Sequence, residues 1–197
     1  MFVTFEGADG SGKSTQAELL RDALAAEGRE VVLTREPGGT EVGERVRQLV
    51  LNGPEMSGWA EAALFAAARA ELVATVIRPA LDRGAAVIAD RYVDSSLAYQ
   101  GFARGLGIDA VLELNLAVVQ QLMPDLTVLL LVDVDEARRR AGATDRLERE
   151  GDGFRSLVNA GYLELAKMFP ERIVALDGTQ PRDELSEVIR ERLRSRI

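Results

Sequence analysis

Short apolar segments alternate with longer amphipathic segments along most of the chain. The short segments are rich in β-branched residues and lack strict alternation, which is typical of strands buried on both faces of a parallel sheet. Five such strands are predicted, at Phe2–Phe5, Val31–Thr34, Val87–Ala89, Thr127–Val134 and Ile173–Leu176. Helical segments separate them. This order predicts an α/β fold with a doubly wound five-stranded parallel sheet flanked by helices.

Apolar residues recur at helical spacing between the predicted strands. The first such segment, Ser14–Glu27, carries one apolar face and ends at Gly28, a common helix stop. The other predicted helices are Glu61–Asp82, Asp109–Leu122, Asp152–Met168 and Arg182–Arg194. We expect Pro79 to bend or close the second of these helices, because proline lacks the N–H that a helix interior needs.

No internal repeat, low-complexity tract or linker interrupts residues 1–197, so we predict a single domain. The most charged stretch is Ala137–Glu150, ARRRAGATDRLERE, which we call the lid segment. It follows a predicted strand and has a short helical pattern broken by Gly142. Two interpretations are open at this point, a solvated surface helix and a mobile basic lid.

The charge balance limits the possible partners. The chain has 24 basic and 32 acidic residues, a net charge of −8, which argues against a protein that coats nucleic acid. No apolar run approaches the roughly 18 residues of a membrane span, and the first residues, MFVTFEG, do not resemble a signal peptide. We therefore expect a cytoplasmic enzyme or binding protein that contacts neither nucleic acid nor membrane.

The chain contains no cysteine and no histidine. These absences exclude disulfides, a thiolate nucleophile, a Ser-His triad and a histidine metal site. Any chemistry must depend on carboxylates, arginine, lysine, hydroxyls and backbone N–H groups. Lysine is rare, since Lys13 and Lys167 are the only two, and Lys13 falls in a glycine-rich loop.

That loop follows the first predicted strand and fits the pattern G-x-x-x-x-G-K-[ST], which requires this context. Its glycines let backbone N–H groups surround a phosphate, and the following helix directs its positive end at the same anion. We expect Lys13 to reach the β- and γ-phosphates of ATP and Ser14 to help bind Mg²⁺. The predicted ATP-binding residues of the loop are Gly7, Ala8, Asp9, Gly10, Ser11, Gly12, Lys13, Ser14 and Thr15.

A phosphate loop occurs in phosphotransferases and in GTPase switches. A switch normally carries an N-K-x-D segment, but Asn52, Asn115 and Asn159 are followed by Gly, Leu and Ala. The sequence therefore favours an enzyme that transfers a phosphoryl group. An NTP-binding scaffold without catalysis is a further alternative that the pattern leaves open.

Arginine residues follow two of the predicted strands. Arg35 lies in LTREPGGT and Arg91 in VIADRY, so both are expected at the sheet edge that carries the glycine loop. Asp90, beside Arg91, is suitable for Mg²⁺ or its water shell. The alternative for each arginine is a surface ion pair, but two arginines at strand ends favour an anion site.

Six motifs occur in the order found in thymidylate kinases, which phosphorylate dTMP with ATP. They are FEGADGSGKST, TREPGGT, LFAAARAE, DRYVDSSLAYQG, DRLE and YLELA, and the resemblance extends from about residue 2 to about residue 181. The chain resembles this family over nearly its whole length. The resemblance implies a P-loop NTPase fold, ATP and Mg²⁺ as phosphate donor and cofactor, and a homodimer formed through long helices such as Glu61–Asp82 and Asp109–Leu122.

The resemblance also implies how dTMP is bound. Asp9 matches the residue that binds the deoxyribose 3′-hydroxyl, and Arg35 and Arg91 match a clamp on the dTMP phosphate. Phe65 matches the ring that stacks on thymine, and Arg69 matches a donor to a thymine carbonyl.

Three more residues of the DRY segment complete the implied nucleoside site. Ser96 and Gln100 match positions at the base edge. Tyr99 matches the residue packed against the sugar C2′, where a ribose hydroxyl would clash. Leu157 and Asn159 stand where the family often has arginines, so we assign no phosphate contact to the helix after the lid segment.

The glycine at position 10 indicates, through the family resemblance, a role for the lid segment. Family members with glycine at this loop position supply an arginine from the lid, and this lid carries Arg138, Arg139, Arg140 and Arg146. The resemblance to this bacterial type implies Arg146 as the main catalytic arginine and Arg139 as a contact to adenine. With Lys13, Asp90 and Arg91, Arg146 completes the predicted catalytic set. The alternative is a related kinase that acts on another nucleotide or a nucleoside.

Overall fold

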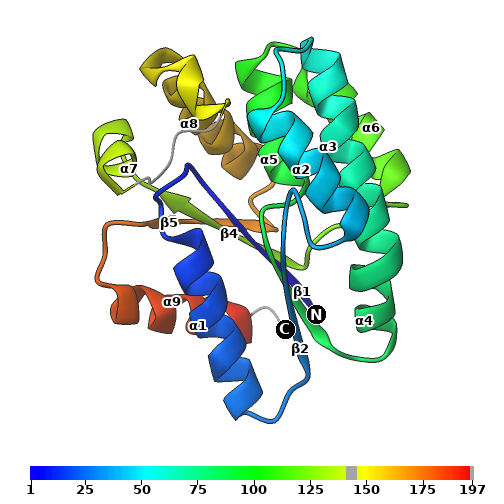
Figure 1. Cartoon of the computed structure of the whole chain (residues 1–197). Helices are drawn as coiled ribbons and strands as arrows, with labels where there is room; N and C mark the ends of the chain where they lie inside the picture. The colour runs from blue at the N-terminus through cyan, green and yellow to red at the C-terminus, as the bar shows by residue number, and fades with distance from the viewer. Residues whose placement is uncertain (141–145, 196–197) are drawn as a thin grey trace.

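The computed structural model describes residues 1–140 and 146–195 and contains one five-stranded sheet. All of its strand pairs are parallel, in the order β2-β3-β1-β4-β5 (Figure 1). The strands are β1 Phe2–Glu6, β2 Val31–Arg35, β3 Ala86–Asp90, β4 Leu126–Leu131 and β5 Ile173–Asp177. The predicted α/β fold with five parallel strands is confirmed.

The register of the strands brings the predicted site together. In the ladder between β1 and β3, Phe5 is opposite Asp90, and in the ladder between β2 and β3, Arg35 is opposite the same residue. The glycine loop after β1 therefore lies next to the residues that end β2 and β3. This is the edge where open α/β sheets bind their ligands.

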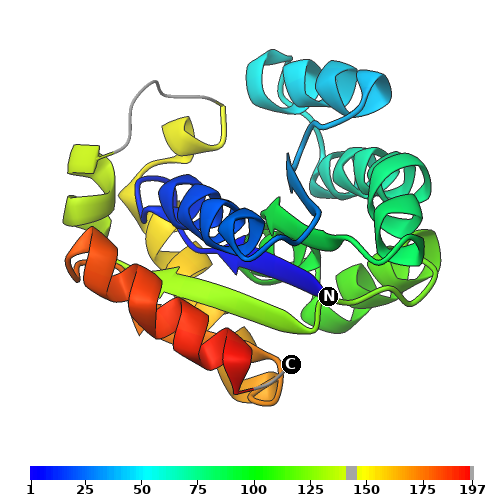
Figure 2. The same cartoon turned by 90° about the horizontal axis from the view of Figure 1, so that it is seen from below.

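Helices cover both faces of the sheet (Figures 1 and 2). One face carries α1 and α9, whose apolar residues share a buried cluster with residues of β1, β3 and β4. The other face carries most of the remaining helices around a second buried cluster. The helices of the first face are α1 Lys13–Ala26 and α9 Arg182–Arg194. Those that contribute to the second cluster include α3 Gly58–Leu72, α4 Arg78–Asp82, α6 Ile108–Val118 and α8 Asp152–Met168.

The helix predicted over Glu61–Asp82 is interrupted by a π-helical turn. Residues Val73–Ile77 form this turn between α3 and α4, and Pro79 lies in the first turn of α4. A proline ring clashes with the carbonyl four residues earlier, and a wider turn relieves that clash. The helical segment therefore continues past Pro79 through Asp82.

Two helical segments were not predicted from the sequence, α2 Glu41–Asn52 and the continuous stretch of α5 Val93–Ser96 with the π-helical Leu97–Ala103. Helix α7 Val134–Arg140 includes the start of the short helical pattern predicted in the lid segment. Helix α2 begins at Thr40, whose side chain accepts a hydrogen bond from the N–H of Gly43. The strand predicted to reach Val134 ends at Leu131, because α7 starts at Val134.

The lid segment contributes the end of α7 and a short 3-10 turn at Glu148–Glu150. The break predicted at Gly142 lies outside the described residues. No helix in the described ranges is long and apolar enough to cross a bilayer.

A carboxylate in the core connects three elements behind the sheet edge. Glu6, the last residue of β1, has no solvent exposure and accepts hydrogen bonds from the N–H of Tyr92 at 2.7 Å and the hydroxyl of Ser95 at 2.6 Å. The hydroxyl of Tyr162, on α8, donates to the same carboxylate at 2.9 Å. Burial and the nearby charge of Asp94 raise the pKa of Glu6 to about 7, against a lowering by Arg91.

We expect the raised pKa of Glu6 to make stability depend on pH. Between pH 4.5, its ordinary value, and about pH 7 the folded state binds more protons than the unfolded state, so stability falls as pH rises. Relative to Glu6→Gln, the free energy of unfolding should fall by about 3 kcal/mol across this window. Urea unfolding of both proteins at several pH values measures it, and parallel pH profiles would contradict it.

Candidate active site

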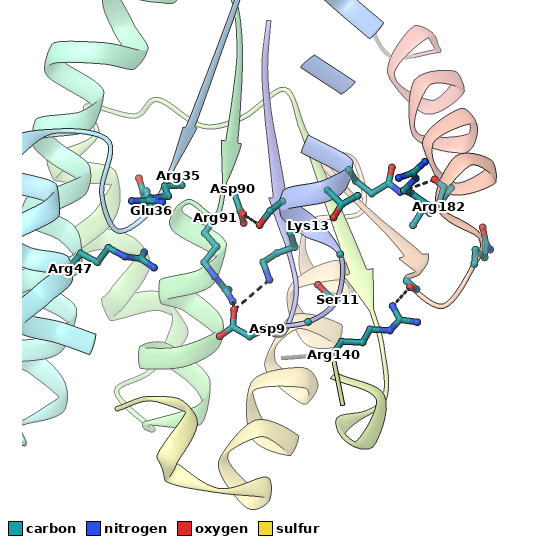
Figure 3. A pocket seen from close by; sticks show the side chains of 18 residues that line it. Asp9, Ser11, Lys13, Arg35, Glu36, Arg47, Asp90, Arg91, Arg140 and Arg182 are labelled. Carbon is teal, nitrogen blue, oxygen red and sulfur yellow. Dashed lines mark hydrogen bonds and ion pairs between the residues drawn. The ribbon is translucent and has the colours of Figure 1, made fainter. Parts of the chain in front are cut away.

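A cavity of about 730 Å³ opens at the carboxyl ends of the strands (Figure 3). The glycine loop, the ends of β2 and β3, Arg47 of α2, Arg140 of α7 and residues of the Gly178–Arg182 stretch line it. Figure 3 shows Arg35, Glu36 and Arg47 at one side, Arg140 and Arg182 at the other, and Asp9, Lys13 and Arg91 between them. The lining is therefore basic although the chain as a whole is acidic.

The glycine loop has the geometry of an anion cradle. Gly7 has φ +137°, and a Cβ there would lie 2.3 Å from the carbonyl oxygen of Leu130. Gly10 and Gly12 also have positive φ, which side chains disfavour. The hydroxyl of Ser11 is buried and has no hydrogen-bond partner among the described residues. These features fit a loop that wraps the phosphates of a nucleotide.

Lys13 begins α1 and lies inside this loop, where its Nζ donates to the carbonyl of Ala8 at 2.8 Å. Burial and the positive charge of Arg91 lower its pKa to about 8, although Asp9, 3.7 Å away, opposes the shift. A phosphate bound in the loop would supply the missing negative charge. The ammonium group is therefore placed for an anionic ligand rather than for a fixed protein partner.

Arg91 connects the loop to the rest of the cavity. It has φ +75°, an unusual backbone conformation for this residue type that is found often at functional sites. Its Nη2 donates to Asp9 at 2.6 Å, and its Nη1 donates to Ser95 at 3.0 Å and to Tyr162 at 3.1 Å. Burial raises the pKa of Asp9, but Arg91 and Lys13 together lower it well below its ordinary value. Asp9 is thus ionised.

Ser14 and Asp90, the residues predicted for Mg²⁺, lie in direct contact, since the Ser14 hydroxyl donates to the Asp90 carboxylate. The described residues contain no group of three or more acidic side chains that could hold a metal alone. Mg²⁺ in kinases uses one or two carboxylates together with phosphate oxygens and waters. One hydroxyl and one carboxylate beside a phosphate cradle fit that mode.

A smaller cavity of about 90 Å³ adjoins the first and brings together most residues predicted for the nucleoside. Its lining includes Phe65, Ser96, Tyr99 and Gln100. Four residues line both cavities, namely Asp9, Glu36, Arg47 and Arg91. Two of these four, Glu36 and Arg47, are not among the site residues predicted from the sequence. Glu36 stands next to Arg35 in the quoted TREPGGT motif, whereas Arg47 lies on α2, the helix that the pattern did not reveal.

Arg69 is held by buried protein groups. Its side chain is 1% exposed, and the guanidinium donates to Glu36, Ser96, Asn115 and the carbonyl of Tyr92. An ion-pair contact at 2.6 Å also joins its Nη2 to Glu36, so all three guanidinium nitrogens contact protein groups. Arg69 supports Ser96 from behind the smaller cavity, and its contact to a thymine carbonyl stays a prediction.

Arg35 has a partner outside the cavity. Its guanidinium is 58% exposed and lies 3.2 Å from Glu44 of α2. Because exposed ion pairs contribute little free energy, this pairing leaves Arg35 able to turn toward an anion. Its role in binding dTMP phosphate stays a prediction.

In the lid segment, the predicted catalytic arginine is paired with buried protein groups. Arg146, predicted to face the phosphates, is 2% exposed and pairs with Glu61 of α3. Its Nε donates to the carbonyl of Val50 and its backbone N–H to that of Leu51, both at 2.9 Å. A buried carboxylate and the carbonyls near the end of α2 therefore hold it away from the larger cavity.

Arg140 lies at the larger cavity instead of Arg146. It donates to the carbonyl of Gly178 at 3.0 Å and pairs with Glu136 one helical turn earlier. Arg139 is 74% exposed and also pairs with Glu136, so its predicted contact with adenine stays a prediction. Gly178 and Gln180, from the turn after β5, also line the cavity.

Known proteins resemble this chain in sequence and in structure. The thymidylate kinase family model matches residues 5–189. A thymidylate kinase of Clavibacter michiganensis subsp. michiganensis is 50% identical, and one of Leifsonia xyli subsp. xyli is 49% identical; both matches cover 100% of this chain and 96% of the relative.

A solved structure extends the comparison to the fold. The crystal structure of thymidylate kinase from Ehrlichia chaffeensis superposes with a TM-score of 0.80 and 36% sequence identity, covering 96% of this chain and 98% of that one. These three comparisons agree: the family model matches most of the chain, the relatives align over nearly their whole length, and the fold is shared. The chain belongs to the thymidylate kinase family.

Proposed function

We propose that this chain transfers the γ-phosphate of ATP to dTMP and releases dTDP and ADP. The observation that carries the proposal is the pair of adjoining cavities, which share Asp9 and Arg91. The larger cavity has a phosphate loop, and the smaller one has an aromatic ring, Phe65, beside hydrogen-bonding groups. A donor and an acceptor nucleotide bound in them would meet at the shared residues.

In this proposal an oxygen of the dTMP phosphate attacks the γ-phosphorus, and the bond from that phosphorus to the bridging oxygen of ADP breaks. The transition state is loose, so catalysis depends on positioning and on neutralising charge. The N–H groups of the loop and Lys13 hold the donor. Arg91, oriented by Asp9, and Arg35 hold the acceptor phosphate.

Ser14 and Asp90 would hold Mg²⁺ together with phosphate oxygens. When bound, the ion supplies further positive charge to the donor phosphates. Arg140 supplies a positive charge from α7 on the opposite side of the cavity, where it replaces Arg146 in the proposed catalytic set.

Three broader proposals accompany this one. Residues 1–197 form a single nucleoside monophosphate kinase domain that acts in the cytoplasm. The protein is a homodimer, which the family resemblance supports. Exposed apolar side chains such as Trp59 of α3, 49% exposed, suit such an interface.

A panel of acceptors tests the activity directly. With ATP and Mg²⁺, we expect ADP formation to be fastest with dTMP among dTMP, dUMP, dCMP, dGMP, dAMP and thymidine, because the smaller cavity contains residues that the family resemblance assigns to thymine. Preference for another acceptor would favour a related nucleotide or nucleoside kinase. No turnover of any acceptor would favour a non-catalytic NTP-binding scaffold.

The assignment of the lid arginine has its own test. Arg140→Ala should lower kcat by roughly 10²- to 10³-fold, since it removes a positive charge from the phosphate cavity. Arg146→Ala should lower the midpoint of urea unfolding and change kcat much less, because Arg146 pairs with buried Glu61.

Arg138→Ala is the matched control for both lid variants. Arg138 is 66% exposed and pairs only weakly, at 3.5 Å, with Asp152. Its removal should change neither kcat nor stability appreciably. A large loss of kcat in Arg146→Ala with normal turnover in Arg140→Ala would reverse the assignment.

The lowered pKa of Lys13 predicts how ATP binding depends on pH. Above about pH 8 the free protein loses the Lys13 proton, so binding of the phosphates requires proton uptake and weakens. From pH 7.5 to pH 9.5 the Kd of a non-hydrolysable ATP analogue should rise by roughly tenfold. Titration calorimetry measures this, and Lys13→Arg, which stays charged, should give a flatter profile. Equal profiles would contradict the prediction.

A further inference from the structure

One face of helix α3 carries Phe65, which lines the smaller cavity, between two buried charged side chains. Glu61, Phe65 and Arg69 follow one another at intervals of four residues, which places them on the same face of a helix. Phe65 lines the cavity, and Arg69 lies behind Ser96. Glu61, one turn before Phe65, has no solvent exposure.

The carboxylate of Glu61 accepts hydrogen bonds from three side chains. The Nε2 of Gln100 donates to Oε1 at 2.8 Å, and Arg104 donates to both oxygens, at 3.1 Å and 3.0 Å. Arg146, from the lid segment, pairs with Oε2. A fully buried acid is thus surrounded by two arginines and one amide.

This environment keeps Glu61 ionised. Burial raises its pKa, but the hydrogen bonds from Arg104, Gln100 and Arg146 outweigh burial and lower the pKa below its ordinary value. An ionised carboxylate only accepts hydrogen bonds. The side-chain amide of Gln100 must therefore turn its NH₂ toward Glu61 and its oxygen the other way.

We propose that Glu61 is a positioning residue that fixes the Gln100 amide with its oxygen toward the base and thereby selects against cytosine. The proposal rests on the proposed function, which assigns Gln100 to the base edge. Thymine and uracil carry a hydrogen on N3 and can donate to this oxygen. Cytosine has an unprotonated N3, so two acceptors would face each other.

An amide without a fixed neighbour could rotate and donate to cytosine instead. Rotation of Gln100 beside Glu61 would bring its oxygen against a carboxylate and leave the carboxylate without one donor. A buried polar group that loses its partner is unfavourable, which is how hydrogen-bonding sites reject near-identical substrates. Arg104 and Arg146 both pair with Glu61, so the carboxylate keeps a cationic partner when Arg104 is removed.

The test compares kcat/KM for dTMP, dUMP and dCMP in the unchanged protein and in Glu61→Gln. A glutamine at this position can accept or donate, so both orientations of Gln100 become available. The preference for dTMP over dCMP should fall by at least about tenfold, while the preference for dTMP over dUMP, which differ in a methyl group, should stay the same. A uniform loss with all three acceptors would show a purely structural role and overturn the proposal.

Arg104→Gln is the matched control. It removes another partner of the same carboxylate and leaves the Gln100 contact in place. The ratio of dTMP to dCMP should be unchanged in this variant. A fall equal to that in Glu61→Gln would attribute selectivity to the charge network as a whole and reject the specific role of Glu61.

A second readout needs no substitution at Glu61 and no catalysis. The side-chain NH₂ signal of Gln100 in nuclear magnetic resonance is assigned by its loss in Gln100→Met. One of its two protons should exchange slowly with solvent, as expected for a donor to a buried carboxylate. Fast exchange of both protons would overturn the proposal even if Glu61→Gln does not fold. Absence of dTMP turnover in the unchanged protein would instead reject the proposed function and leave this orientation test valid.

Discussion

The arrangement of the whole site depends on the buried carboxylate of Glu6. It ends the central strand and receives hydrogen bonds from Ser95 and Tyr162, the same two hydroxyl groups to which Arg91 donates. The carboxylate and the guanidinium thus share two polar neighbours in the buried region behind the sheet edge. This network orients Arg91 toward Asp9, and Asp9 belongs to the glycine loop. Sheet, phosphate loop and acceptor cavity are therefore held in one geometry.

Two more buried carboxylates near the smaller cavity are held by polar partners in a similar way. Glu36 and Glu61 are both buried, and each pairs with an arginine that is itself buried, Arg69 and Arg146. Burying a charge is unfavourable unless it is paired and hydrogen-bonded, so such pairs are weak evidence for stability. They do restrict the side chains that touch them. Two of those neighbours, Ser96 beside Arg69 and Gln100 beside Glu61, line the smaller cavity. The buried pairs therefore fix polar groups of that cavity.

The four lid arginines have the same side-chain chemistry but occupy different positions in the tertiary structure. All four share the same charge and lie within nine residues of each other in sequence. Arg140 continues helix α7 toward the cavity, while Arg146 meets Glu61, 85 residues away along the chain. A sequence pattern can show that a basic segment is present. Which member enters the cavity depends on partners that are distant in sequence.

The sequence by itself determined the sheet, the phosphate loop and the strand-end residues Asp90 and Arg91. These follow from local spacing and from the rule that parallel strands end at one edge. It also indicated Phe65 and Gln100 through family resemblance.

Only the tertiary structure decided the partners of Arg69 and Arg146, the path of α2 with Arg47, and the burial of Glu6 and Glu61. Burial and long-range pairing arise from packing between segments 23 to 156 residues apart, and no local pattern records them.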